Sequence, residues 1–196
     1  MSTATAENIT AESTTVGSAG SVAAGNWKID TVHSTVGFAV RHMVVATFRG
    51  RFERYDGELV VGEDGAPVLR GGVDVDSIVV KDESLAGHLG SPDFFDSERH
   101  PRITFSSTGI TVGEDGRIEV EGELTIKGHT HGVTARGSIA GPHVDIAGNE
   151  KLGVELEAVI DRREYGLQWN APLPKGGFAL ENEVKLEVSL ELVREA

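Results

Sequence analysis

The 196-residue chain contains no cysteine, which excludes disulfides, thiolate metal sites and cysteine nucleophiles. It has no hydrophobic run of the length that a membrane-spanning helix needs, about 20 residues. Basic residues are also few, 18 against 31 acidic ones, for a formal net charge of −13. Such a surplus repels nucleic acid and anionic lipid headgroups, and no basic stripe in the sequence offsets it. We therefore expect no nucleic-acid partner and no stable membrane insertion.

The N-terminal 25 residues consist mostly of Ser, Thr, Ala and Gly. They lack the basic start and the apolar block of a secretory signal peptide. This composition buries too little apolar surface to fold, so we predict a disordered tail over residues 1–25. The remaining residues, 26–196, are enough for one domain with a substantial core. We expect a soluble, cytoplasmic protein.

Beyond the tail, apolar and polar residues alternate with a period of two, which indicates strands with one dry face and one wet face. The clearest alternation covers residues 118–126, 133–139, 152–160 and 184–192, and shorter apolar series centre on Phe38, Phe52, Val73 and Ile103. Phe52 and Tyr55 differ in parity, which indicates a bulge between them. The sequence Val-Gly-Glu-Asp-Gly occurs at 61–65 and 112–116, and Asp-Gly between alternating strands is typical of a hairpin turn.

These patterns predict an all-β domain of about eight long antiparallel strands. With no amphipathic helices to cover its apolar face, the sheet either packs as two layers or closes into a barrel, and closure also removes exposed edges. One short helix is predicted over residues 81–89, with acidic residues at its start and Leu85 and Leu89 on one face. Gly90-Ser91-Pro92 ends it. Two helical turns are too short to cover the flank of a barrel, so we place this helix and its following loop near a barrel end.

The interior of such a barrel is either packed solid or hollow. Gly122, Ala135, Gly137 and Ala158 have the inward parity, at positions where a filled barrel needs bulk. They either make room for large side chains, with Trp27, Trp169 and Phe178 as the candidates, or they line a cavity. The predicted lining is nearly free of charge, so a ligand in that cavity would be apolar and elongated.

Aromatic residues make up only 6% of the chain, yet Phe94 and Phe95 stand together in a polar loop. Loops seldom expose two large apolar rings to water. Because the loop follows the only predicted helix, we expect both rings to cover an end of the barrel. They act either as a gate for a tunnel mouth or as a permanent hydrophobic cap.

Several segments together resemble the YceI-like family, whose members are lipocalin-like barrels that bind polyisoprenoids. These segments are Trp27–Asp30, His33–Ser34, Val36–His42, Ser77–Ile78, His88–Asp96, Pro101–Phe105, Gly122–Gly128 and Asp161–Leu167. The resemblance covers about residues 26–193 and implies an extended eight-stranded antiparallel lipocalin-like barrel that holds a long isoprenoid. A homodimer is also compatible with it. Two departures, Val79-Val80 and Lys151, are expected near barrel ends and bear on headgroup preference.

The histidines do not assemble into an evident metal or catalytic site. His129 and His131 could present two imidazoles on one strand face, but Gly128 and Gly132 flank them as in a turn. The sequence offers no third ligand, so we predict no metal site. His33 and Ser34 are adjacent on a strand and point to opposite faces, so they cannot pair as base and nucleophile. His42 and His88 each end an apolar segment and are candidates for contact with a polar headgroup, as are Arg162 and Arg163 with an anionic one.

The leading hypothesis is a non-catalytic carrier that holds an isoprenoid or quinone-like lipid inside the barrel and needs no cofactor. The predicted ligand-binding residues are Phe38, Val40, His42, Phe48, His88, Phe94, Phe95, Phe105, Leu124, Val133, Leu156 and Trp169. The alternatives are an enzyme that acts on a hydrophobic substrate through His33, His42 or His88, and an interaction module with a solid core.

Overall fold

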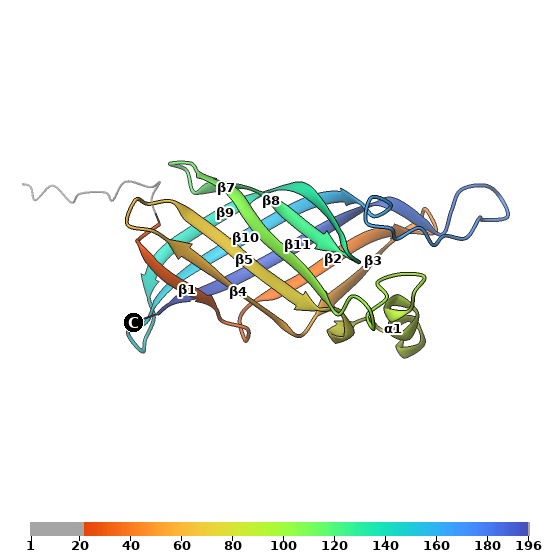
Figure 1. Ribbon diagram of the computed structural model, residues 1–196, viewed down its shortest axis with the longest axis horizontal. Helices are drawn as coiled ribbons and strands as arrows, with labels where there is room; N and C mark the ends of the chain where they lie inside the picture. The colour runs from red at the N-terminus through yellow and green to blue at the C-terminus, as the bar shows by residue number, and fades with distance from the viewer. Residues whose placement is uncertain (1–21, 196) are drawn as a thin grey trace, which may run out of the picture.

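The computed structural model describes residues 22–195, which form one elongated antiparallel barrel (Figure 1). The strands are β1 (Gly25–Ile29), β2 (Thr35–His42), β3 (Ala46–Phe52), β4 (Tyr55–Val61), β5 (Pro67–Asp74), β6 (Ile78–Val79), β7 (Arg102–Val112), β8 (Arg117–Ile126), β9 (His129–Val144), β10 (Glu150–Asp161) and β11 (Leu180–Arg194). A 3-10 turn, η1 (Val75–Ser77), precedes β6, and the helix α1 (Glu83–Gly90) follows it.

The sheet closes because β1 pairs on one side with β4 and on the other with β11. The ring runs β1-β4-β5-β7-β8-β9-β10-β11. β2 continues β1 along the same edge of β11, opposite β10, and β3 pairs with β2. The pairs β1/β2 and β3/β4 each behave as one long strand with an interruption. The predicted eight-stranded antiparallel barrel is therefore confirmed.

The predicted irregularity between Phe52 and Tyr55 is a break in the strand. Ser77 fills it from η1: its backbone oxygen accepts the N–H of Glu53 (3.1 Å) and its hydroxyl oxygen accepts the N–H of Arg54 (3.0 Å). The hydroxyl of Ser77 in turn donates to Asp74 O at 2.6 Å. The two N–H groups that leave the ladder are thus satisfied, which a half-buried bend requires.

The turns and the helix lie close to their predicted positions. Gly65 and Gly116 take left-handed backbone angles (φ 77° and 76°) in the two Glu-Asp-Gly turns, which β-carbon-bearing residues rarely adopt. The helix begins after Asp82, whose carboxylate accepts the N–H of Leu85 at 2.8 Å, two residues later than the predicted start. It lies at the end of the barrel opposite the C-terminus (Figure 1).

The apolar faces of the strands bury two clusters along the barrel axis. One surrounds Trp27 and fills the end formed by β1, here called the packed end. The other lies toward α1 and includes Phe52, Phe94, Phe95 and Tyr165. We call that end the α1 end. The predicted tail falls mostly on residues 1–21, which lie outside the described residues, while Val22 and Ala23 pack against the first cluster.

Candidate ligand cavity

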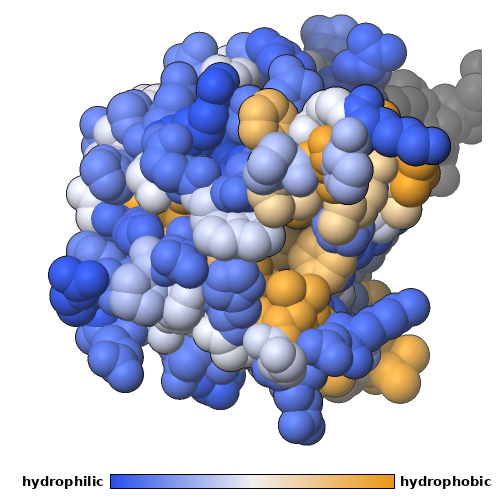
Figure 2. Space-filling model, turned by 90° about the vertical axis from the view of Figure 1, so that its right-hand side faces the viewer, coloured by the Kyte–Doolittle hydropathy of each residue, from blue (hydrophilic) through white to orange (hydrophobic). Residues whose placement is uncertain are grey.

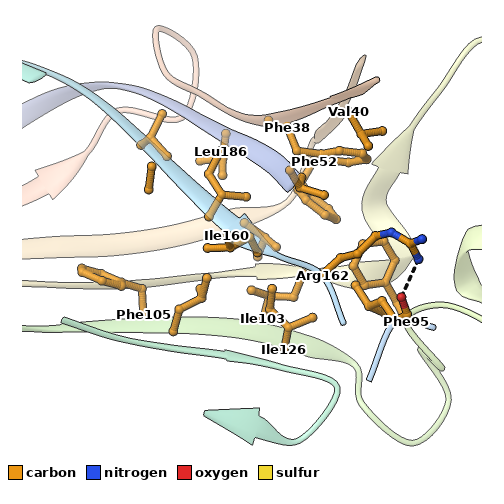
Figure 3. Close-up of a pocket in the computed structure, with 18 of the residues that line it drawn as sticks. Phe38, Val40, Phe52, Phe95, Ile103, Phe105, Ile126, Ile160, Arg162 and Leu186 are labelled. Carbon is orange, nitrogen blue, oxygen red and sulfur yellow. Dashed lines mark hydrogen bonds between the residues drawn. The ribbon is translucent and has the colours of Figure 1, made fainter. Parts of the chain in front are cut away.

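The barrel encloses a cavity of about 450 Å³ that is lined by residues of both clusters. Its wall reaches the surface at the α1 end beside Met43, which lines the cavity and is 40% exposed. Apolar side chains from opposite walls point into it, including Phe38, Phe105, Ile103, Ile160 and Leu186 (Figure 3). Its volume lies within the range of about 300–1,000 Å³ that is usual for small-molecule pockets. Leu69, Leu156 and Leu190 line it and also belong to the cluster of the packed end, so that cluster forms its floor.

All twelve residues proposed from the sequence as ligand-binding lie in the wall of this one cavity. They are Phe38, Val40, His42, Phe48, His88, Phe94, Phe95, Phe105, Leu124, Val133, Leu156 and Trp169. The strand residues were found by parity alone, since a side chain of the inward series must face the barrel axis. Their contact with a ligand stays a prediction.

The small residues of the inner face have two separate roles. The Phe105 ring lies over Gly122, and the Phe38 ring lies over Gly50, so those glycines make room for phenylalanines of the cavity wall. Ala135 and Ala158 line the cavity itself. The large residues suggested from the sequence are placed otherwise: Trp27 is in the packed end, and Phe178 is 58% exposed.

Three aromatic rings meet at the α1 end of the cavity. The His88 ring stands edge-on to Phe94 and to Trp169, each with centroids 5.0 Å apart, and Phe94 lies 5.3 Å from Trp169. Phe95 makes an edge contact with Phe52 at 6.3 Å. Both phenylalanines of the polar loop are buried, so they cover this end as expected.

The loop that carries Phe94 and Phe95 is tied back to the end of α1. The N–H groups of Phe95 and Ser97 donate to Leu89 O (3.0 Å) and Gly90 O (2.9 Å). The Lys127 ammonium donates to Pro92 O at 2.7 Å, from the turn between β8 and β9. These bonds hold the two rings in one position over the cavity.

Arg162 is the buried charge in the cavity wall, with only 3% of its surface exposed. Its guanidinium donates to the backbone oxygens of Glu181 (3.0 Å), Leu167 (2.5 Å) and Trp169 (2.8 Å), and to Asn182 Oδ1 (3.4 Å). Figure 3 shows it at the α1 end, beside Phe95. Among residues 22–195 it forms no ion pair, and burial lowers its pKa below the ordinary arginine value.

The parity of the preceding strand is a sequence signal for this burial. The even-numbered inward series of β10, from Leu152 to Ile160, continues in register to residue 162. Arg163 has the opposite parity, is exposed, and its Nη2 lies 2.5 Å from Asp161 Oδ2. Of the two arginines proposed from the sequence for a headgroup, only Arg162 lies in the cavity wall.

The three histidines of the enzyme hypothesis do not converge. His42 and His88 line the cavity, whereas His33 lies outside it, on the turn between β1 and β2. His33 Nδ1 is 2.9 Å from Asp30 Oδ2, and the Ser34 hydroxyl oxygen accepts the N–H of Glu191 at 2.9 Å. His33 and Ser34 therefore have separate partners, each tying the turn together or to β11.

One group of three metal-ligand residues occurs among the described residues, at Asp30, His33 and Glu191. The Lys151 ammonium already lies 2.5 Å from Glu191 Oε1 and 3.5 Å from Asp30 Oδ2. The Lys151 ammonium thus already contacts both carboxylates and offsets part of their negative charge. His129 and His131, the pair considered from the sequence, are not part of this group.

The two departures from the family pattern are not among the residues that line the cavity. Lys151 belongs to the charged group just described, and Val79 and Val80 are absent from the cavity wall. Val80 packs against the cluster of the α1 end. The effect of these departures on headgroup preference stays a prediction.

Comparison with known proteins places this chain in a family. Residues 27–192 match the YceI-like domain. The chain belongs to the YceI-like family. The curated relatives include UPF0312 proteins of Staphylococcus aureus strain N315, 31% identical over 169 residues (85% of this chain, 96% of the relative), and of Staphylococcus epidermidis, 31% identical over 168 residues (84% and 95%).

Solved structures share the fold of this YceI-like chain. BcnA of Burkholderia cenocepacia superposes with a TM-score of 0.71 at 21% identity, over 83% of this chain and 98% of BcnA. A polyisoprenoid-binding domain from Saccharophagus degradans gives a TM-score of 0.66 at 14% identity, over 86% and 98%. Within residues 22–195, no helix is long and apolar enough to cross a bilayer.

Proposed function

We propose that this YceI-like protein is a non-catalytic carrier that holds one long prenyl lipid in its barrel. The observation that carries the proposal is the enclosed cavity of about 450 Å³ whose wall is built almost wholly of apolar side chains. Transfer of an apolar chain from water into such a space is favoured by about 25 cal/mol per Å² of buried surface. The polyisoprenoid-binding domain among the structural neighbours agrees with this class of ligand.

The cavity wall also suggests how the lipid is oriented. The floor of the cavity is formed by Leu69, Leu156 and Leu190, whereas Arg162, His42 and His88 lie toward the α1 end. Arginine has five N–H groups, and four hydrogen bonds account for four of them. We propose that the lipid tail lies against the floor and that its polar head, a hydroxyl or a phosphate, lies beside Arg162.

Prenol binding can be measured with the protein's own tryptophans. Trp169 lines the cavity, whereas Trp27 is fully buried in the packed end. Titration with farnesol or geranylgeraniol should change the emission of Trp169 and saturate at one lipid per chain. A Trp169→Phe variant should lose the emission change and keep one bound lipid in native mass spectrometry.

Two neighbouring positions on β10 provide a matched pair of variants that tests whether the lipid binds inside the cavity. Ala158 lines the cavity, and Val159 is 61% exposed on the outer face. Ala158→Phe fills the space and should weaken prenol binding about tenfold or more, since it removes the volume that the lipid needs. Val159→Phe adds a ring outside and should leave the affinity unchanged. Equal affinities for both variants, or a barrel that takes up no prenol, would disprove the proposal.

A further inference from the structure

Four large apolar side chains are exposed at the α1 end, around the opening of the cavity. Met43 (40% exposed), Val44 (53%) and Val45 (81%) form the turn between β2 and β3, and Phe178 (58%) belongs to the loop of residues 171–178. We call these four residues the apolar rim. Figure 2 views this end and shows hydrophobic side chains gathered beside hydrophilic ones. Met43 also lines the cavity, so the rim is continuous with the lipid site.

The backbone holds the rim side chains in position. Met43 and Val44 both take left-handed angles, with φ of 52° and 67°. This conformation is uncommon for residues other than Gly and Asn, and is rarest for a β-branched residue such as Val44. The Arg41 guanidinium donates to Val44 O at 2.6 Å, and the N–H of Met43 donates to Ala179 O at 2.8 Å. Positions with these backbone angles are usually occupied by Asn or Gly, but here they are occupied by Met43 and Val44, whose side chains are exposed to solvent.

Phe178, the fourth residue of the apolar rim, belongs to a hydrogen-bonded loop beside that turn. The N–H groups of Leu173 and Ala179 donate to Gly177 O (3.0 Å) and Ala171 O (2.8 Å). Gly177 lies against the Val44 side chain. This loop, in blue, extends beyond α1 along the long axis of the molecule (Figure 1).

The charge of these two segments is opposite to that of the whole chain. Residues 36–52 and 165–180 contain no Asp or Glu, although the chain has 31, and they carry Arg41, Arg49, Arg51 and Lys175. Arg49 and Arg51 lie 4.0 Å and 3.5 Å from carboxylate oxygens of Glu187 and Glu53, whereas Arg41 and Lys175 have no carboxylate within ion-pair distance among residues 22–195. The two segments meet where Gly177 lies against Val44, although they are more than a hundred residues apart in the sequence.

We propose that the apolar rim docks on an anionic lipid bilayer, so that a prenyl lipid passes between membrane and barrel without crossing water. Exposed apolar side chains flanked by Arg and Lys are the combination that binds membrane interfaces. Each basic residue near an anionic surface contributes about 1 kcal/mol, which is about a fivefold change in affinity. The acidic barrel behind the rim is screened beyond about 8–10 Å at physiological ionic strength.

Vesicle co-sedimentation tests the docking directly. Empty vesicles of phosphatidylcholine with phosphatidylglycerol should bind the protein at low ionic strength, and vesicles of phosphatidylcholine alone should bind it much less. A triple variant should lower the vesicle affinity about tenfold or more; it combines Val44→Ser, Val45→Ser and Phe178→Ser. Lys175→Glu should lower it about fivefold or more at low salt, with a smaller effect at high salt.

The turn between β9 and β10 provides the matched control. Val144 (68% exposed) and Ile146 (110%) lie at the packed end, next to Asp145. Val144→Ser with Ile146→Ser removes similar apolar surface and should leave vesicle binding unchanged. Equal loss in rim and control variants would overturn the proposal, as would the absence of binding to anionic vesicles. Self-association of the protein that only rim variants abolish would assign the rim to a second copy and overturn it as well.

The role given to docking, lipid transfer, rests on the proposed carrier function. The vesicle-binding test of docking does not depend on that function. The vesicles contain no prenol, so a failure of lipid uptake leaves the sedimentation result unaffected. Conversely, rim variants should keep the farnesol affinity of the unmodified protein, and should only slow the transfer of geranylgeraniol from vesicles. Loss of farnesol binding together with docking would indicate a damaged barrel, and then the rim assignment fails.

Discussion

At the scale of single residues, Arg162 and Arg163 show how strand parity decides the role of a side chain. Arg162 points inward, is 3% exposed, and gives its hydrogen bonds to three backbone oxygens and one amide oxygen. Arg163 points outward and pairs with Asp161, whose pKa it lowers to about 2. Two side chains of the same type thus have different roles: Arg162 is part of the cavity wall, and Arg163 forms an ion pair on the surface.

Replacing each arginine with methionine separates these roles. Arg162→Met leaves the oxygens of Leu167, Trp169 and Glu181 without a donor in a buried region, so the free energy of unfolding should fall by about 3 kcal/mol. Arg163→Met removes an exposed ion pair and should change it little. Urea unfolding followed by circular dichroism measures both. Equal losses would contradict the assignment of Arg162 as a buried anchor.

At the scale of elements, α1 and its loop cover part of one end of the barrel. The helix is short, yet Leu89, Phe94 and Phe95 are all buried in the cluster of that end. Backbone bonds between the loop and the C-terminus of the helix make the two one unit. Such a unit fits a permanent cap better than a moving gate, because opening it would break these bonds and expose two rings.

The cap interpretation predicts the effect of removing one ring. Phe95→Ala should lower the free energy of unfolding by about 3–5 kcal/mol, as expected for a buried phenylalanine. The rate at which prenol dissociates should change by less than about threefold. Stopped-flow displacement of farnesol, read from Trp169 emission, measures that rate. Much faster dissociation without loss of stability would show instead that the ring is a gate.

At the scale of the whole molecule, the sequence predicts the barrel better than it predicts its two ends. Alternation identifies which residues of β8, β9, β10 and β11 face inward, because parity is a local property. It cannot show that Phe105 lies over Gly122 or that the turn at Met43 meets the loop at Phe178. Those contacts depend on strand register and on loops brought together by closure. The cavity wall was therefore predictable from sequence, and the rim was not.

The two ends also differ in what stabilises them. Aromatic rings cover part of the α1 end, whereas a charged group on the outer surface ties the packed end together. There His33, on the turn between β1 and β2, contacts Asp30 and Glu191, and Lys151 of β10 contacts Asp30, Glu191 and Asp145. This group links the turn to three other segments, so its ionisation affects the whole barrel.

The charged group predicts how stability depends on pH. A hydrogen bond from His33, the N–H of Val32 and the charge of Lys151 lower the pKa of Asp30 from 3.8 to about 2. A carboxylate whose pKa is lower in the folded state stabilises that state above its unfolded pKa, and this contribution is lost as pH falls from about 4 to about 2. Asp30→Asn removes the contribution, so the melting temperature should be lower than that of the unmodified protein at pH 6. It should then fall less steeply between pH 4 and pH 2.

Glu63→Gln, on the exposed turn between β4 and β5, changes the net charge by the same amount without touching this group. It should therefore keep the steep dependence of the unmodified protein. Differential scanning calorimetry at a series of pH values measures all three proteins. If Asp30→Asn and Glu63→Gln give the same slope, net charge governs the acid transition, and the link between the turn and the barrel contributes nothing to it.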